Sequence, residues 1–293
     1  MANVGLHGTS PWHLSESFWP VGTFTMRIGL IGLGTIGKEV ARAVREGRAG
    51  EASIVTILVR DTRKFLPHET NLLHGKITAD PEEFFSSDME VAIEVAGHEA
   101  LRQYAERTLR SGRDMLAVSV GALADESLLS SIRRATEESN RRLLIPSGAL
   151  GALDAISAGA IGAIEEITLV VRKAPAAWKG TAAEEVASRA ADVPICFYEG
   201  KAREATRAFP QNVNVLAALS LAGIGFDQTN VKMYVDPTVK HNTFELTSRG
   251  DFGELKVELK NRPYPENPKT GHLVVLSLIK AIRRLQERII VGF

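Results

Sequence analysis

The chain has 293 residues, of which 44% are hydrophobic and 24% charged, and its 35 basic and 35 acidic side chains cancel to a formal net charge of zero. This balance is typical of a globular protein of about two domains and excludes a disordered chain, while the lack of a basic excess argues against nucleic-acid binding. No apolar run approaches the roughly 18–20 residues of a membrane helix, and a single cysteine, Cys196, excludes an intrachain disulfide and favours a soluble, cytoplasmic protein.

Residues 1–25 contain glycine, proline, serine and tryptophan without any period, and they lack the basic and apolar regions of a signal peptide. We expect a disordered extension here, because the first organised element begins at Met26. Met1 and Met26 are both candidate starts of translation.

From Met26 onward, short β-branched runs alternate with longer helical stretches. The pattern predicts strands at Arg27–Ile31, Ser53–Val59, Val91–Val95, Met115–Val120 and Arg142–Ile145. It predicts helices from the first strand through Arg48, at Glu99–Ser111 and at Glu126–Ser139, with an acidic turn at Asp80–Glu83. Such alternation indicates βαβ units, and so a doubly wound parallel sheet of the α/β class over residues 26–150.

Three glycines directly follow the first predicted strand and open the first helix. Gly32, Gly34 and Gly37 form a G-x-G-x-x-G motif around Thr35 and Ile36. In this context the motif favours a Rossmann domain that holds the pyrophosphate of a dinucleotide at the helix N-terminus. A glycine-rich turn of an ordinary α/β domain is the alternative.

The residues after the second strand bear on the choice of cofactor. An acidic side chain there binds a ribose hydroxyl, whereas an arginine accommodates a 2′-phosphate. Arg60 favours NADP and Asp61 favours NAD, so the sequence predicts NAD or NADP. Further cofactor contacts are expected where the later strands end, at Ala96, Gly97, His98, Ser119, Val120, Gly121 and Ala149.

After residue 150 the pattern changes to that of an α+β domain, which we expect over residues 151–270 as the substrate and dimerisation domain. Helices are predicted at Ala152–Ile164 and, as the one helix between the strands, at Val213–Leu221. Strands are predicted at Glu166–Arg172, Cys196–Tyr198, Val231–Val235, Thr243–Thr247 and Glu254–Leu259. These suggest an antiparallel sheet with helices on one face. A last helix, Leu273–Glu287, is expected to pack back on the Rossmann domain within residues 271–293.

Six separated segments resemble the L-aspartate dehydrogenase family from about Met26 to Leu285. They read GLIGLGTIG, EVAGHEAL, VSVGALAD, PSGALGALDA, EGKAREATRAFPQNVNVLAALSLAG and PENPKTGHLVVLSLIKAI. The resemblance implies a homodimer that deaminates L-aspartate oxidatively with NAD(P), through iminosuccinate, to oxaloacetate and ammonia. It also implies nicotinamide contacts from Ala149 and Asn214.

The chain departs from the family pattern D-P-x-x-x-x-N-x-H, whose histidine is taken as the acid/base. Here Asp236, Pro237 and Asn242 match, but Phe244 occupies the histidine position. His241 is the nearest imidazole and the candidate catalytic residue, although residues three apart in a strand point to opposite faces.

This departure keeps two other functions open. One is an NAD(P)-dependent dehydrogenase or reductase of another small amino acid or carbonyl compound, and the other is a catalytically silent dinucleotide-binding protein. Lys173 and Lys179 are candidate ligands of a dicarboxylic amino acid or oxo acid, which needs cations. No two histidines have metal-ligand spacing on one element, so we expect no metal.

Overall fold

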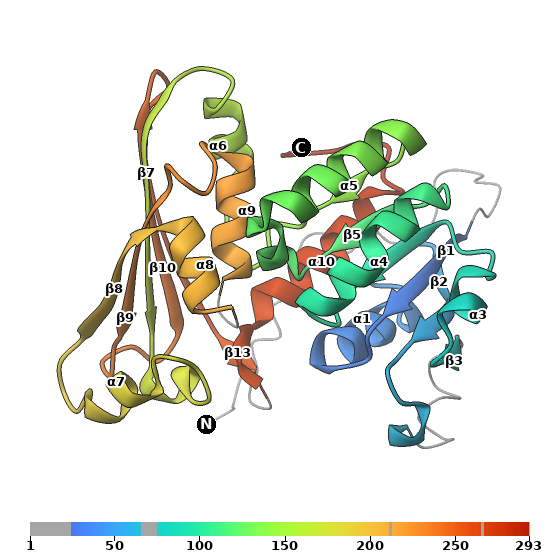
Figure 1. The fold of residues 1–293 in the computed structure, drawn as a ribbon, viewed down its shortest axis with the longest axis horizontal. Coiled ribbons are helices and arrows are strands. Elements are labelled where there is room, and N and C mark those ends of the chain that lie inside the picture. The colour runs from blue at the N-terminus through green and yellow to red at the C-terminus, as the bar shows by residue number, and fades with distance from the viewer. Residues whose placement is uncertain (1–24, 66–74, 211–212, 265–266, 293) are drawn as a thin grey trace, which may run out of the picture.

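The computed structural model describes residues 25–65, 75–210, 213–264 and 267–292, so the expected extension lies outside the described residues apart from Thr25. Two sheets lie at opposite ends of the molecule, and helices α8 and α9 lie between them (Figure 1). None of the described helices is both long enough and apolar enough to cross a membrane.

The first sheet has six parallel strands in the order β3-β2-β1-β4-β5-β6. Their bounds are β1 Met26–Ile31, β2 Ala52–Leu58, β3 Lys76–Thr78, β4 Val91–Glu94, β5 Asp114–Ala117 and β6 Leu143–Leu144. From β1 the next strands are added on one side, and from β4 they are added on the other. In α/β sheets, ligands bind at such a point of reversal, beyond the carboxyl ends of the strands. The predicted doubly wound domain is therefore confirmed.

Helices cover both faces of this sheet, and most begin or end close to the predicted bounds. They are α1 Thr35–Arg45, α3 Pro81–Phe85, α4 His98–Arg110 and α5 Glu126–Ser139, with 3₁₀ turns η1 Thr62–Lys64 and η2 Val120–Ala124. The strand predicted through Val120 ends at Ala117, because the chain turns into η2, whose residues are all buried.

The acidic turn predicted at Asp80–Glu83 is wrong, since these residues start helix α3. The Asp80 carboxylate accepts a hydrogen bond of 2.8 Å from the Glu82 amide, and Pro81 occupies the first turn. Phe84 and Phe85 are buried. Five residues are too few to show a helical period, whereas the capping residue and the proline were readable signals.

The second sheet has five strands in the order β11-β10-β7-β9-β8. The bounds are β7 Ile164–Lys173, β8 Ile195–Lys201, β9 Asn230–Val235, β10 Asn242–Gly250 and β11 Gly253–Asn261. The sheet is mixed and not wholly antiparallel as expected, because β7 and β9 run parallel. Parallel neighbours need a long crossover, and the chain between these two strands supplies one with β8 and several helices.

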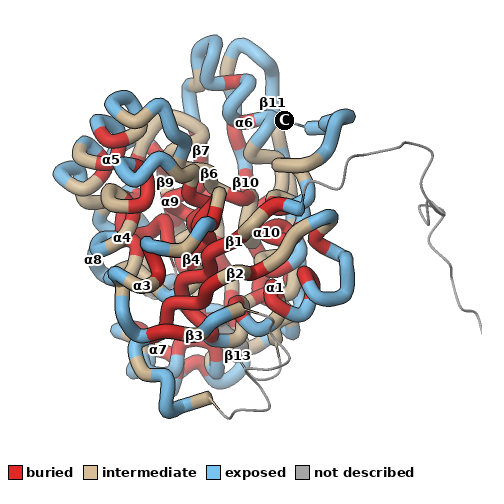
Figure 2. The backbone as a smooth tube through the Cα atoms, turned by 90° about the vertical axis from the view of Figure 1, so that its right-hand side faces the viewer, coloured by how far each residue is buried: buried red, intermediate tan, exposed pale blue. Residues whose placement is uncertain are grey.

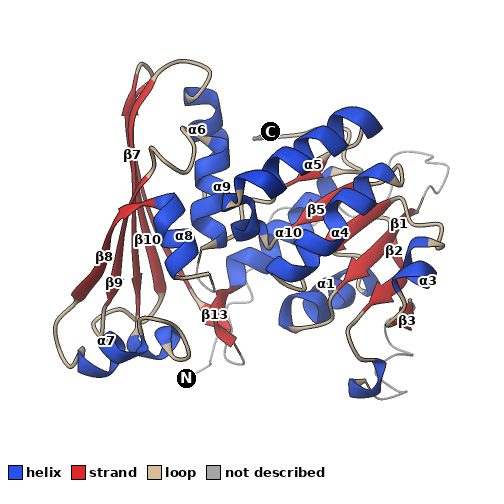
Figure 3. Cartoon of the chain, viewed as in Figure 1, coloured by secondary structure: helices blue, strands red, loops and turns tan. Residues whose placement is uncertain are grey.

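Helices α6, α8 and α9 of this domain lie on one face of the mixed sheet, and α7 lies at one end of its strands (Figure 3). The described elements are α6 Leu153–Gly159, η3 Pro175–Trp178, α7 Glu184–Arg189, α8 Ala202–Ala208 and α9 Asn214–Ala222. The expectation of one helix between the strands is wrong, since α7 and α8 also lie there. Both have only six or seven residues and show too little of a period. The helix predicted through Ile164 stops at Gly159, and Ile164 begins β7.

The chain ends on the first domain. A ribbon of β12 Pro263–Tyr264 and β13 Asn267–Gly271 leads into α10 His272–Arg284. The inward face of α10, including Leu278 and Ile282, shares a hydrophobic cluster with Val40 of α1. Buried residues concentrate along the parallel strands and these inner helix faces (Figure 2). Helix α10 therefore completes the layer on one side of the first sheet.

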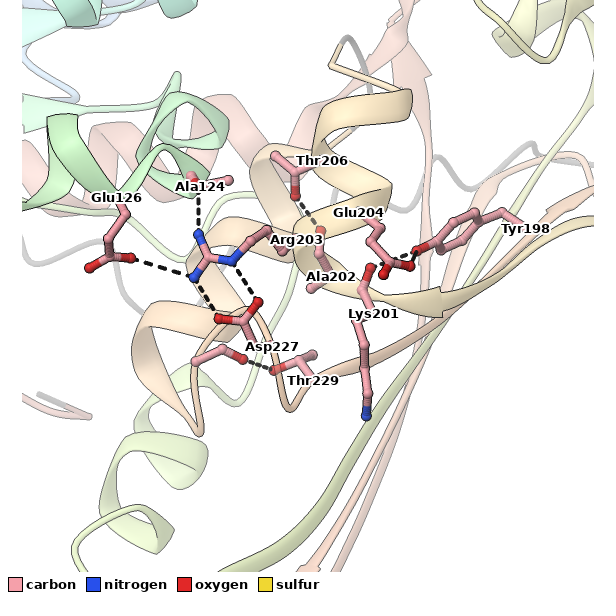
Figure 4. Close-up of polar contacts among 11 residues, drawn as sticks. Ala124, Glu126, Tyr198, Lys201, Ala202, Arg203, Glu204, Thr206, Asp227 and Thr229 are labelled. Carbon is pink, nitrogen blue, oxygen red and sulfur yellow. Dashed lines mark hydrogen bonds and ion pairs between the residues drawn. The ribbon is translucent and has the colours of Figure 1, made fainter.

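An arginine of α8 joins the two domains (Figure 4). Arg203 of α8 donates from Nη1 to the carbonyl oxygen of Ala124 in η2 at 2.6 Å, and its Nη2 lies 3.5 Å from the Glu126 carboxylate. Asp227 holds the same guanidinium through bonds of 2.6 and 2.7 Å. The guanidinium thus fixes the separation of α8 from the loop that follows β5.

Candidate cofactor and substrate site

The glycine turn has the shape that a dinucleotide requires. Gly32 has a φ of +100°, and a Cβ there would lie 2.7 Å from the Cβ of Ala96; one on Gly37 would lie 2.3 Å from the Gly32 carbonyl oxygen. A Cβ on Gly34 would meet nothing within 4 Å. Thr35 and Ile36 begin α1 with no side-chain cap, so the free amides of the first turn are available to a phosphate.

A buried carboxylate holds together the two loops beside this turn. Glu94, at the end of β4, is fully buried and accepts bonds from the amides of Ala96 and Gly97 at 2.7 and 2.8 Å. It also accepts from the Ser119 amide at 3.1 Å and the Ser119 hydroxyl at 2.9 Å. Burial raises the pKa of Glu94 above its ordinary value, and these four hydrogen bonds oppose that rise.

An amide from the second domain reaches these loops. Asn214, the first residue of α9, accepts through Oδ1 from the Gly121 amide at 2.9 Å, and His98 Nε2 lies 2.9 Å from the same oxygen. Because an amide oxygen can only accept, His98 Nε2 carries the proton and donates. Both bonds use the oxygen, so the Nδ2 group of Asn214 is left as the donor at this point.

The loop after β6 is held from two sides. Asn261, at the end of β11, donates from Nδ2 to the Ala149 carbonyl oxygen at 2.6 Å. The Gly148 amide donates to the Ser277 hydroxyl of α10 at 3.0 Å. The Ala149 loop is therefore fixed by both domains at the edge where the parallel strands end.

A cavity of about 330 Å³ lies between the domains at this edge. Its walls come from the ends of β5, β6 and β7, the start of α9, the strands β10 and β11, and the start of α10. The lining residues are Ala117, Val118, Val120, Pro146, Ser147, Gly148, Ala149, Lys173, Val213, Asn214, Val215, Ala218, Asn242, Phe244, Asn261, Thr270, Gly271 and Val274.

Of the residues that the sequence suggested for substrate binding and catalysis, some line this cavity and others do not. Lys173 is buried and lines it, whereas Lys179 is exposed on the following loop. Asn242 and Phe244, two residues apart on β10, both line the wall. His241 is half-buried and is not among the lining residues, as the alternation of the strand implies.

Arg60 and Asp61, the two charged residues after β2, differ in their contacts. The Asp61 carboxylate caps η1 and accepts from the backbone and guanidinium of Arg63 at 2.9–3.1 Å, and these bonds lower the pKa of Asp61. Arg60 is exposed, and it forms no hydrogen bond or ion pair with the described residues.

Several of these positions were not singled out from the sequence. Glu94, Asn261 and Ser277 carry the contacts that hold the loops. Glu94 and Ser277 lie within segments that resemble the family but were not picked out there, and Asn261 lies outside those segments. Of the three, Glu94 was the easiest to recognise from the sequence, because a charged residue at the end of an otherwise apolar buried strand needs partners. Within the described ranges, no cluster of three or more histidine, cysteine, aspartate or glutamate side chains could hold a metal ion.

A Rossmann domain with a glycine turn, closed by a second domain over a cavity at the strand ends, defines a two-domain NAD(P)-dependent oxidoreductase. Residues 32–146 match the NAD-binding domain of homoserine dehydrogenase, and residues 154–285 match the C-terminal domain of aspartate dehydrogenase. The chain belongs to the L-aspartate dehydrogenase family.

Individual relatives agree with this assignment. The chain is 38% identical over 269 residues to the L-aspartate dehydrogenase of Methanocella arvoryzae, covering 91% of this chain and 99% of that protein. The aspartate dehydrogenase of Thermotoga maritima has the same fold, with a TM-score of 0.73 and 24% identity over 92% of this chain and all of that one. The scyllo-inositol dehydrogenase of Lactobacillus casei, solved with bound NAD(H), aligns with a TM-score of 0.51 and 15% identity, over 90% of this chain and 88% of that one.

Proposed function

We propose that the chain oxidises L-aspartate to iminosuccinate with NAD⁺ or NADP⁺, and that iminosuccinate then hydrolyses to oxaloacetate and ammonia. The observation that carries this proposal is the cavity between the domains, which joins the Ala149 loop and Asn214 to the carboxyl edge of the parallel sheet. The identity to L-aspartate dehydrogenases supports the choice of substrate.

The residues present fit a dinucleotide. The space at Gly34 suits a pyrophosphate, with Gly32, Thr35, Ile36 and Gly37 forming the turn around it. The loops that would flank the ribose and the nicotinamide contain Ala96, Gly97, His98, Ser119, Val120, Gly121 and Ala149. When bound there, the nicotinamide would accept a hydride from the substrate α-carbon. Asp61 would face the adenosine ribose, and Arg60 would accommodate the extra phosphate of NADP.

In this proposal Asn214 recognises the nicotinamide carboxamide. Its oxygen is used by His98 and Gly121, so its Nδ2 group would donate to the carboxamide oxygen. His98 acts on the cofactor through Asn214, because its protonated nitrogen faces the asparagine. His98 is thereby a positioning residue in the cofactor site.

Turnover tests the proposal directly. Initial rates would be measured with L-aspartate and each oxidised cofactor, and in reverse with oxaloacetate, ammonia and each reduced cofactor. We expect activity in both directions. The initial rates of His241→Ala should stay within about twofold of the parental rates, because His241 does not line the cavity. A collapse of the rate in that variant would make His241 the acid/base.

The other candidate functions are decided by the same assay. Turnover of a different amino acid or carbonyl compound in the absence of aspartate turnover would replace the substrate. NADH or NADPH binding without turnover of any of them would indicate a silent dinucleotide-binding protein.

A homodimer is the assembly that the family resemblance implies, and we propose it here. The face of the mixed sheet turned away from α6, α8 and α9 has no described helix against it (Figure 1). Light scattering coupled to gel filtration would give the mass in solution, and a monomer at micromolar concentration would reject the dimer.

A further inference from the structure

The cavity has one ionisable side chain among the described residues that line it, Lys173. This lysine ends β7, is 3% exposed, and lies with Nζ 5.5 Å from the centre of the Trp178 ring. Trp178 is itself fully buried and donates from Nε1 to the Lys173 carbonyl oxygen at 3.3 Å. An aromatic ring and a backbone bond therefore hold the lysine at the cavity wall.

The register of the sheet places this amine next to Phe244. Strands β7 and β10 are antiparallel, with Phe244 opposite Val171 and Thr243 opposite Arg172. Lys173 follows two residues after Val171, so it lies on the same face of the sheet as Phe244. Both line the cavity, on neighbouring strands.

Oxidative deamination needs a group that accepts and returns protons, because the substrate nitrogen enters as an ammonium. The other described imidazoles of this region face elsewhere. His98 donates to Asn214, His241 does not line the cavity, and His272 stacks on Tyr264 with ring centres 3.9 Å apart. The amides and hydroxyls of the lining can orient a carboxylate, but they do not ionise near neutral pH and so cannot serve as the acid/base.

We propose that Lys173 is the acid/base of the reaction, an inference that rests on the proposed function. The neutral Nζ accepts a proton from the substrate ammonium, and the α-hydrogen then leaves with its electron pair to NAD(P)⁺, which is reduced. The nitrogen lone pair forms the C=N bond of the iminium. Lys173 then releases this proton to solvent. Water adds to the iminium carbon and gives one proton to Nζ, which returns it to the nitrogen of the carbinolamine. Ammonia leaves as the carbinolamine hydroxyl gives its proton to Nζ and the C=O bond forms. Lysines in poorly hydrated sites serve as general bases in other enzymes.

Two substitutions at Lys173 test this assignment. Lys173→Met removes the amine but keeps an unbranched chain beside Trp178, whereas Lys173→Arg has a permanent positive charge and cannot lose its proton. Because a positioned acid/base contributes about 10²–10⁴-fold, we expect kcat for L-aspartate to fall at least 100-fold in both variants. The KM for L-aspartate should change far less, and the matched surface variant Lys179→Met should retain parental kcat.

Binding and stability show whether the variants are intact. The Kd of NADH, measured by fluorescence, and the melting temperature should stay close to the parental values in both variants. Full kcat in Lys173→Met would overturn the proposal. A raised KM in Lys173→Met together with parental kcat in Lys173→Arg would also overturn it, and would indicate that the lysine binds a substrate carboxylate. An inactive parent would reject the proposed function and this role with it, whereas an active parent with active variants rejects only the role of Lys173. If Lys173→Met does not fold, Lys173→Arg alone decides.

A double variant adds a positive test. An imidazole introduced by Phe244→His on the neighbouring strand would reach the same cavity. In the Lys173→Met background we expect it to restore kcat at least tenfold. No gain over Lys173→Met alone would count against a proton-transfer role at this wall.

Discussion

Replacing Glu94 with glutamine should weaken both the fold and the cofactor site. One carboxylate oxygen accepts from the amides of Ala96 and Gly97 and from the Ser119 hydroxyl, and the other accepts from the Ser119 amide. Glutamine has a single acceptor oxygen. In its better orientation the new NH₂ group faces the Ser119 amide, so two donors meet inside the protein.

The magnitude follows from the count of lost partners. One hydrogen bond to a charged group disappears, and a buried amide is left without an acceptor, each worth about 1–3 kcal/mol. Removing the buried charge offsets part of this loss. We therefore expect Glu94→Gln to lower the free energy of unfolding by about 2–4 kcal/mol, or the melting temperature by roughly 4–16 °C at about 2–4 °C per kcal/mol.

Urea unfolding followed by circular dichroism would measure the loss, and NADH titration would measure the loosening of the two loops. Ser119→Ala is the matched control, because it removes only the hydroxyl donor and should cost about 1 kcal/mol. If Glu94→Gln were as stable as the parent within 0.5 kcal/mol, the buried carboxyl would have to be protonated. The description of an anion held by four donors would then be wrong.

Three further outcomes follow from the site. Gly34→Val should weaken NADH and NADPH binding at least tenfold with an unchanged melting temperature, because a Cβ there meets nothing within 4 Å of the protein; equal binding in a fluorescence titration would remove this turn from the phosphate site. Arg60→Ala should weaken NADPH by about 1–3 kcal/mol and leave NADH unchanged, and an equal loss for both cofactors would reject the 2′-phosphate contact. Bonds from Ser127 and Arg102 hold the pKa of Asp125 well below its ordinary value, so its stabilisation is complete above the unfolded-state pKa of about 3.9 and is lost as the pH falls through the folded-state pKa. Urea midpoints should show Asp125→Ala about 1 kcal/mol less stable at pH 7, with a difference that shrinks steadily below about pH 4.

The elements that could be predicted from the sequence are those whose period is long enough to read. Helix Glu126–Ser139 begins and ends where predicted, because a capping Asp125 and several apolar turns mark it. Helices α3, α7 and α8 were missed because each has only five to seven residues. The parallel pairing of β7 and β9 was missed for a different reason, since alternation fixes the faces of a strand but not its direction.

The candidate site divides in the same way. The glycine turn is local and could be read from spacing alone, whereas the contacts of Asn214 with His98 and Gly121 join residues about one hundred positions apart. Asn261 and Ser277 support the Ala149 loop from two other elements. Such contacts depend on how the domains meet, which no spacing within either domain encodes.

The phenylalanine at position 244 is consistent with its surroundings in the sheet. Its ring lies opposite Val171 on one neighbouring strand and Leu259 on the other, in an apolar row across three strands. Burying an aromatic ring in such a row stabilises the wall by about 1.5–3 kcal/mol, but it supplies no proton. The proposed mechanism requires one titratable group that faces the cavity, and neighbouring strands are about 5 Å apart with the same face recurring at every second residue. An amine on β7 can therefore reach the same part of the cavity as an imidazole on β10. In the proposed mechanism the register of the sheet, more than the identity of residue 244, supplies the titratable group.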